Sequence, residues 1–317
     1  LVSRVLTWRN RWFDRRVAKT LARERPAAVL CYESCALHSF GHAKPLGVLC
    51  VLDQCTSHIK TGLKLYREEA ERHPEFADSL PVQFLEGFVE QCCEELERAD
   101  AVVVSSSYCR QTLLDHGVGE GKIFEVPYAA DISRFRPAES RKRQPFRVLF
   151  VGQVSQRKGI KYLLEAFKQL ALPNAELLLV GGIAGSGKGL EAYRSLFTHI
   201  PSVPYPELHR SFQLGSIFAL PSLHDSGVLA IHEALASGLP VITTPNSGSV
   251  VRDGIEGFIV PIRDVEALKE KILLLYENKE LREEMSRRAR LRAEEFTWAA
   301  YRQRLNRVLL DLLASRG

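Results

Sequence analysis

Residues 221–244 read PSLHDSGVLAIHEALASGLPVITT and join two apolar runs that indicate buried strands, 216–220 and 240–243. Between these runs the sequence predicts a short helix whose first turn begins near Gly227. Asp225 lies just before that helix, and Glu233 lies about two turns along it. The segment therefore places two carboxylates, separated by seven residues, around the start of one helix.

The start of a helix presents unpaired backbone N–H groups and a partial positive charge, so an anion such as a diphosphate can bind there. A carboxylate at the helix start can reach hydroxyl groups on one side of that anion. A carboxylate further along the helix can reach hydroxyl groups on the other side. The spacing of Asp225 and Glu233 therefore favours a sugar on one side of a diphosphate and a ribose on the other.

Apolar runs alternate with helical patterns along the chain, which is typical of parallel sheets with helices on both faces. The polar, proline-bounded stretch 137–145 indicates a linker between two such series. In the first series the segment 84–98 predicts a helix, and the charged span 55–80 is expected to be irregular or partly helical. The second series ends in helices over 264–313. The expected strands are 27–32, 47–52, 101–105 and 122–126, then 146–151, 176–180, 216–220, 240–243 and 257–260.

Segment 221–244 resembles the E-x7-E donor motif of family 4 glycosyltransferases, with Asp225 in place of the first Glu. Segments 99–110, 126–137 and 253–261 are also similar to that family. The resemblance implies the GT-B architecture, in which two Rossmann-like, doubly wound α/β domains face a cleft. We expect an acceptor-side domain at 1–140, a nucleotide-sugar domain at 141–297, and a helix at 298–317 that returns to the first domain.

Family members begin with a strand and a Gly-rich loop that no segment before Ala27 matches. The resemblance therefore implies that the first domain is incomplete. A non-catalytic remnant that binds a nucleotide sugar stays open as an alternative to an active enzyme.

A second motif, VGQVSQRKG at 151–159, follows one expected strand and opens a helix. Gly152 lets the backbone approach a ligand closely. Lys158 places a cation at a helix start, which is unfavourable unless an anion is present. The family usually has Arg where Gln153 stands, so either Arg157 replaces that charge or the remaining donors suffice.

The resemblance implies a retaining transfer of a sugar from a nucleotide-diphosphate sugar to a glycan, lipid or other hydroxyl acceptor, with no metal or other cofactor required. Glu233 would bind the ribose and Asp225 the transferred sugar, with a helix N-cap as the alternative role of Asp225. His58 would face the acceptor, with a solvated loop histidine as the alternative. The leaving diphosphate would be held by Lys158, Gly152 and the backbone of Gly227, Val228 and Leu229. The expected donor-binding residues also include Gln153, Arg157 and Ser226.

Segment 182–189, GIAGSGKG, fits the P-loop pattern G-x-x-x-x-G-K and follows a predicted strand. The position that needs Ser or Thr for magnesium is Gly189. A P-loop NTPase is therefore a weaker alternative than a variable loop that carries Lys188.

Residues 4–25 carry eight Lys or Arg residues against Asp14 and Glu24, with three aromatic residues interleaved. This pattern is compatible with contact with an anionic membrane surface. The alternative is a solvated helix that packs Val5, Trp8 and Trp12 on its sheet. No recognised motif accompanies the charge, so nucleic acid is not expected.

All seven cysteines precede residue 110, and most lie in apolar runs where Cys acts as a small hydrophobic residue. The odd count argues against a disulfide framework and favours a reducing cytoplasm, with peripheral attachment to the inner face of the membrane as a further option. Cys31, Cys35, His38 and His42 match no structural zinc spacing well, so zinc is a minor alternative.

Overall fold

The computed structural model describes residues 2–138 and 145–316. The chain forms two compact units: unit 1 comprises Leu1–Lys64, Pro81–Val126 and Arg302–Gly317, and unit 2 comprises Leu65–Leu80 and Pro127–Tyr301. The expected domains 1–140, 141–297 and 298–317 stay a prediction. The units differ from them by placing 65–80, 127–140 and 298–301 in unit 2. Residues 139–144 of the expected linker lie outside the described residues.

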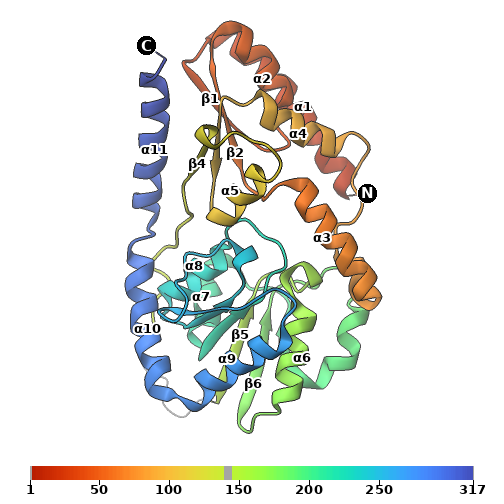
Figure 1. The fold of residues 1–317 in the computed structure, drawn as a ribbon, viewed down its shortest axis with the longest axis vertical. Coiled ribbons are helices and arrows are strands. Elements are labelled where there is room, and N and C mark those ends of the chain that lie inside the picture. The colour runs from red at the N-terminus through yellow and green to blue at the C-terminus, as the bar shows by residue number, and fades with distance from the viewer. Residues whose placement is uncertain (1, 139–144, 317) are drawn as a thin grey trace. The chain divides into compact units, whose positions relative to one another are not determined.

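Unit 1 contains a four-stranded parallel sheet in the order β1-β2-β3-β4 (Figure 1). All four strands were predicted from the sequence to within two residues. The strands are β1 (Ala28–Tyr32), β2 (Leu49–Gln54), β3 (Ala101–Val104) and β4 (Ile123–Glu125). The helices are α1 (Val2–Glu24), α2 (Leu37–Ala43), η1 (Lys44–Leu46), the first part of α3 (Ile59–Arg72), α4 (Phe88–Arg98), α5 (Ser107–Leu114), η3 (Glu120–Lys122) and most of α11 (Trp298–Ala314).

Helix α1 buries a charged residue, Asp14, on its inner face. Asp14 is buried and accepts hydrogen bonds at the start of α2 from the backbone N–H groups of His38 and Ser39, at 2.7 and 2.8 Å. Trp8 and Trp12 are exposed instead, with relative exposures of 67% and 48%. The expectation that Val5, Trp8 and Trp12 pack on the sheet is therefore wrong, because the face with Asp14 is the one that is buried.

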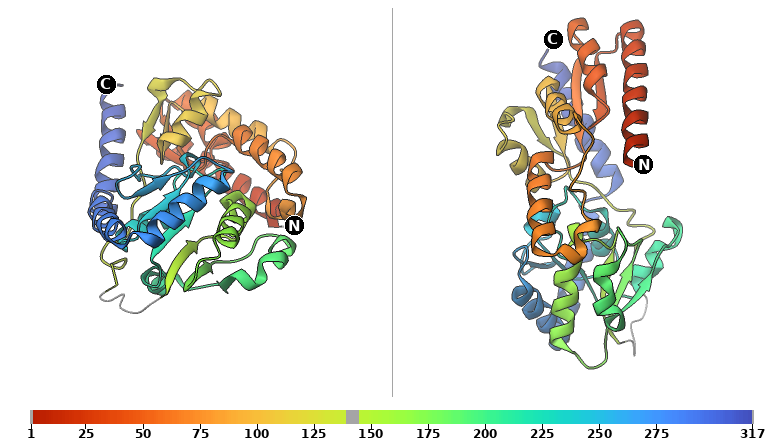
Figure 2. Two further views of the ribbon diagram at one scale, coloured as in Figure 1. Left: turned by 60° about the horizontal axis from the view of Figure 1, so that its bottom comes forward. Right: turned by 90° about the vertical axis from the view of Figure 1, so that its right-hand side faces the viewer.

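Unit 2 contains a six-stranded parallel sheet in the order β10-β9-β8-β5-β6-β7 (Figures 1 and 2). Its strands are β5 (Phe146–Val151), β6 (Ala175–Val180), β7 (Phe197–Ile200), β8 (Ile217–Leu220), β9 (Val241–Thr243) and β10 (Gly257–Ile259). All were predicted except β7. Its helices are the last part of α3, η2 (Pro74–Ser79), η4 (Gln156–Lys158), α6 (Ile160–Leu170), η5 (Lys188–Leu196), η6 (Tyr205–Glu207), α7 (Leu208–Gln213), α8 (Leu229–Ala236), η7 (Pro245–Ser247), α9 (Val265–Glu277), α10 (Lys279–Glu294) and the start of α11.

The strand order of unit 2 creates a switch point between β5 and β8. From β5 the sheet continues to β6 on one side and to β8 on the other, and Val148 and Leu149 pair with Ile217 and Phe218. Ligands of such sheets bind outside the carboxyl ends of the strands at a switch point. The two segments that the sequence analysis singled out, 151–159 and 221–244, both begin at this edge.

Polar side chains cap the N-termini of the C-terminal helices α9 and α10. Asp264 accepts a hydrogen bond from the N–H of Ala267 at 2.8 Å and starts α9. Asn278 accepts one from Leu281 at 2.9 Å and starts α10. Within the described part of the chain, no helix has the length and apolar character needed to cross a bilayer.

Candidate functional site

The loop that follows β8 is fixed by backbone hydrogen bonds from two neighbouring loops. The N–H of Leu223 donates to the carbonyl of Arg157 at 2.9 Å, and the N–H of Asp225 donates to the carbonyl of Asn246 at 2.9 Å. The side-chain amide of Asn246 returns a bond to the carbonyl of Leu223 at 2.8 Å. The backbone at Asp225 is therefore held in place at the carboxyl edge of the sheet.

Asp225 brings together the two cations of segment 151–159. Its Oδ2 lies 2.6 Å from Nζ of Lys158, and its Oδ1 lies 2.9 Å from Nη1 of Arg157. Ser222 Oγ donates a third bond to the carboxylate at 3.1 Å. The structure thus unites residues that are 67 and 68 positions apart in the sequence.

Burial and charge act in opposite directions on this cluster. Burial works to raise the pKa of the Asp225 carboxyl, but Lys158 and Arg157 outweigh it and hold that pKa below its usual range. The side chains of Lys158 and Asp225 are only 9% and 13% exposed, so their mutual attraction is weakly screened. The site therefore carries two fixed cations that are partly neutralised by one carboxylate.

Two glycines shape the edge on which these cations lie. Gly159 has φ +71°, and a Cβ there would lie 2.0 Å from the carbonyl oxygen of Pro221. Only glycine allows that close approach between the two loops. Gly152 has φ +146°, and a Cβ there would meet no atom within 4 Å. Its conformation, rather than crowding, therefore favours glycine, and the space beside it is open.

Glu233 lies on α8, which begins at Leu229 with Val228 as its N-cap and no capping side chain. Asp225 is therefore not the N-cap of this helix, which removes the alternative role expected for it. Glu233 is buried, and burial raises its pKa to about 7, although a hydrogen bond from Tyr205 works in the opposite direction. Tyr205 is half exposed, and the guanidinium of Arg134 lies 5.4 Å from its ring centre.

The remaining residues expected at the donor lie around the same edge. Gln153 is exposed on the loop after β5, and Arg157, not Gln153, is the second cation beside Lys158. Gly227 has φ +154° in the loop before α8. Ser226, Val228 and Leu229 complete that loop and the first turn of α8, where helical N–H groups precede any intrahelical acceptor. Their assignment to the donor stays a prediction.

His58 belongs to unit 1 and is not solvated as the alternative expected. It is buried, and its backbone N–H donates a hydrogen bond to Thr112 Oγ1 at 3.0 Å. Its ring stacks on that of His116, with ring centres 3.8 Å apart. Burial, followed by His116 and Lys60, lowers its pKa to about 4. Its imidazole is therefore neutral at physiological pH. The imidazole lines a pocket of ≈ 250 Å³. Its role towards an acceptor stays a prediction.

The glycine-rich segment 182–189 does not have the features of a P-loop. A carboxylate oxygen of Asp78 accepts the N–H of Ser186 at 2.7 Å, where a P-loop would direct N–H groups at a phosphate. The segment leads into the 3₁₀ helix η5 rather than an α-helix, and Lys188 is exposed. The arrangement therefore argues against the NTPase alternative.

The described residues do not support the zinc alternative. Among residues 2–138 and 145–316 no group of three or more His, Cys, Asp or Glu side chains could hold a metal ion. His38 and His42 instead bond to Arg15 and to the backbone carbonyl of His38.

Sequence analysis missed two aromatic residues that back the cation pair. Tyr66, on α3, is buried beside Arg157, and its ring meets His224 edge-on with centres 5.5 Å apart. Burial lowers the pKa of His224 to about 4, so its imidazole is neutral. The i, i+3 spacing of Tyr66, Glu69 and Arg72 was the available signal of a helix, but the polar residues concealed which face is buried.

The model of one protein family, described as glycosyl transferases group 1, matches residues 131–292 and so covers the residues from Gly152 to Glu233 described above. The chain belongs to this family. A D-inositol 3-phosphate glycosyltransferase from Paenarthrobacter aurescens is 28% identical over 58% of this chain and 50% of its own length. The sulfoquinovosyl transferase of Arabidopsis thaliana is 26% identical over 63% of this chain and 40% of its own. The chain thus spans about half the length of these relatives.

Solved structures of this family's fold class are also similar. Sucrose-phosphate synthase from Thermosynechococcus elongatus superposes with a TM-score of 0.76 at 21% identity, over 96% of this chain and 78% of its own. HepE from Anabaena, solved with UDP, gives 0.73 at 15% identity, over 94% and 82%. These likenesses confirm the α/β, GT-B fold class expected from the sequence.

Proposed function

We propose that this chain supplies a retaining glycosyltransferase activity that moves a sugar from a nucleotide-diphosphate sugar to a hydroxyl acceptor. The observation that carries the proposal is the joint placement of Arg157 and Lys158 at the switch-point edge of unit 2, next to the start of α8. A leaving diphosphate needs concentrated positive charge there. Family membership and a structural neighbour solved with UDP support this choice of donor.

In this proposal Lys158 and Arg157 bind the diphosphate and stabilise the charge that grows as the glycosidic bond breaks. The backbone N–H groups at the start of α8 add donors to the same anion. The two side-chain cations supply the charge that a metal ion would otherwise provide, so no metal is assigned. Glu233 accepts hydrogen bonds from hydroxyl groups of the ribose. These bonds replace the hydrogen bond that Tyr205 donates to Glu233 in the free protein.

Asp225 would accept hydrogen bonds from hydroxyl groups of the transferred sugar once the diphosphate also binds Arg157 and Lys158. A carboxylate bonded to two cations is a poor nucleophile, so no covalent intermediate on Asp225 is assigned. Retention would then follow from attack on the same face that the leaving group departs from. The acceptor is a hydroxyl group of a glycan, a lipid or another polyol; one relative is named for an inositol phosphate acceptor.

A panel of nucleotide sugars in a thermal-shift assay tests the donor. A ligand at one hundred times its dissociation constant should add about 2.7 kcal/mol to the free energy of unfolding. Transfer to an added acceptor, followed by NMR of the anomeric proton, then tests retention. Donor binding without transfer to any acceptor would favour the non-catalytic alternative, and no binding to any nucleotide sugar would refute the proposal.

Helix α1 supports contact with an anionic membrane as part of this function. Trp8, Trp12 and Phe13 are exposed on a helix that also carries four arginines between residues 9 and 16. Exposed aromatic rings beside basic side chains are the chemistry that binds anionic headgroups. We assign this face to a membrane containing anionic lipids, which would bring the enzyme to a lipid acceptor.

A further inference from the structure

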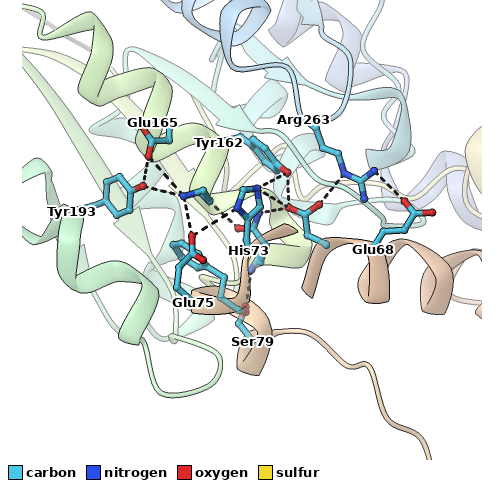
Figure 3. A network of polar contacts seen from close by, with 12 residues as sticks. Glu68, His73, Glu75, Ser79, Tyr162, Glu165, Tyr193 and Arg263 are labelled. Carbon is cyan, nitrogen blue, oxygen red and sulfur yellow. Dashed lines mark hydrogen bonds and ion pairs between the residues drawn. The ribbon is translucent and has the colours of Figure 1, made fainter. Parts of the chain in front are cut away.

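A segment outside the family match forms part of unit 2. Residues 65–80, from the second half of α3 through η2, precede the matched residues 131–292. Tyr66, Glu69 and Phe76 of this segment are buried, with relative exposures of 7%, 0% and 3%. Figure 3 shows the network of polar contacts that this segment makes.

Glu69 is the centre of that network. Its carboxylate accepts hydrogen bonds from Gln156 Nε2 at 2.7 Å, from Tyr162 Oη at 2.5 Å and from Arg263 Nε at 2.8 Å. His73 Nε2 lies 3.7 Å from the same carboxylate. A fully buried carboxylate is costly unless it is bonded in this way.

Arg263 adds a sign that the arrangement is constrained. Its backbone has φ +64°, a left-handed conformation that costs a non-glycine residue roughly 1–2 kcal/mol. Its guanidinium also bonds Glu68 Oε2 at 3.1 Å, so two consecutive carboxylates of α3 hold it (Figure 3). The bonds from Arg263 to Glu69 and Glu68 thus offset the cost of the strained backbone at Arg263.

Gln156 connects Glu69 to the proposed diphosphate site. It is fully buried, its N–H donates to Ser79 Oγ at 3.0 Å, and its Oε1 accepts the N–H of Lys161 at 3.1 Å. Its side-chain N–H group is the donor to Glu69. Because Gln156 immediately precedes Arg157 and Lys158 in η4, fixing Gln156 fixes the backbone from which both cations extend.

We propose that Glu69, acting through Gln156, is a positioning residue that holds Arg157 and Lys158 where a nucleoside diphosphate presents its terminal phosphate. This inference rests on the proposed function of the site. Glu69 does not touch the donor; it limits the positions that η4 can adopt. Tyr66, beside Arg157, acts on the same loop from the preceding helical turn.

The test compares the affinities of UDP and UMP by isothermal titration calorimetry, because UMP lacks the phosphate that the loop would hold. If thermal shift selects another base, the di- and monophosphate of that base replace them. For Glu69→Gln we expect UDP affinity to fall about tenfold, as when one charge-assisted hydrogen bond is weakened, and UMP affinity to change less than twofold. A general loss of packing would change both affinities alike.

Two further variants keep the test decisive. Gln156→Met keeps the volume and removes the link to Glu69 together with the bond to the N–H of Lys161. It should reduce the UDP preference as Glu69→Gln does, even if Glu69→Gln fails to fold. Glu256→Gln is the matched control, because Glu256 is also fully buried and bonded to an arginine, Arg252, outside this network. It should leave the preference unchanged.

Two results would count against the inference, and they are distinguishable. If wild-type protein prefers UDP over UMP and folded Gln156→Met keeps that preference, the positioning role is wrong while the proposed function stands. If wild-type protein binds no nucleoside diphosphate at all, the proposed function is refuted, and the inference with it.

Discussion

Replacing Lys158 tests the charge that the proposed reaction needs. Its ammonium is 2.6 Å from Asp225 and its side chain is 9% exposed, so it acts in a poorly solvated site. Loss of one preorganised donor to developing negative charge typically costs about 2.7–4 kcal/mol, which is roughly 100- to 1,000-fold in kcat. We therefore expect Lys158→Ala to lower kcat by about that factor and to weaken donor binding less.

The same substitution should destabilise the fold only moderately. Removing one partner of a buried pair costs about 3–5 kcal/mol when the other charge is left alone. Asp225 would keep its bonds to Arg157 and Ser222, so we expect roughly 1–2 kcal/mol. Adding Asp225→Ala to Lys158→Ala should lower stability further, because Arg157 would then lose its carboxylate partner.

Steady-state kinetics with the preferred donor, in protein shown to be folded by circular dichroism, measures the outcome. Lys158→Gln should be nearly as slow as Lys158→Ala because it keeps length and removes charge. Lys168→Ala is the matched control, since Lys168 is an exposed lysine on α6, away from the edge of the sheet. A near-normal kcat in Lys158→Gln would refute the reasoning and leave Arg157 or the backbone to hold the diphosphate.

Glu233→Ala should raise the donor dissociation constant by about one to two orders of magnitude, because a charge-assisted bond to ribose is worth roughly 1.5–3 kcal/mol; unchanged calorimetric affinity would discard that role. Since burial raises the pKa of Glu233 to about 7, its protonated form stabilises the free protein. Relative to Glu233→Gln, the wild type should lose up to about 3 kcal/mol of stability as pH rises from 4.5 to 7, and gain donor affinity as the carboxylate forms; a pH-independent difference would contradict this. Lys188→Ala should change nucleotide-sugar affinity by less than about threefold, or ~0.6 kcal/mol, and loss of all nucleotide binding would restore the P-loop alternative. Trp8→Ala with Trp12→Ala should reduce sedimentation with anionic vesicles by about tenfold, because each aromatic ring that enters the membrane contributes to the binding free energy. Trp298→Ala should not reduce it. Equal binding of the wild type to neutral vesicles would refute the membrane assignment.

Strand prediction succeeded where burial is complete. The segments around Val51, Val102 and Phe150 read as apolar runs because both faces of a parallel strand are covered, and each became a strand. β7 (Phe197–Ile200) was missed because it is short and half of it is polar, Thr198 and His199. The partly exposed edge strand β1 was predicted all the same, because its sequence AVLCY is a continuous apolar run.

The span 55–80 shows why part of the site could not be predicted. Helix α3 buries Glu69 beside Tyr66, so its inward face carries a carboxylate that an apolar pattern does not reveal. The partners that make this burial favourable, Gln156 and Arg263, lie 87 and 194 residues further along the chain. No local pattern contains that information, whereas Lys158 and Asp225 were found because each lies in a short motif between a predicted strand and a predicted helix.

The pairing of Asp225 with both cations gives the shorter acid a physical role. Arg157 and Lys158 would repel each other strongly if nothing lay between them, and one carboxylate holds them together. A diphosphate carries more negative charge than a carboxylate and can bridge the same two cations, so it can displace part of that contact. Charge that Asp225 no longer shares with Lys158 and Arg157 then becomes available to hydroxyl groups of the sugar. In the proposed reaction, donor binding and the release of Asp225 from its cations would therefore be one electrostatic exchange.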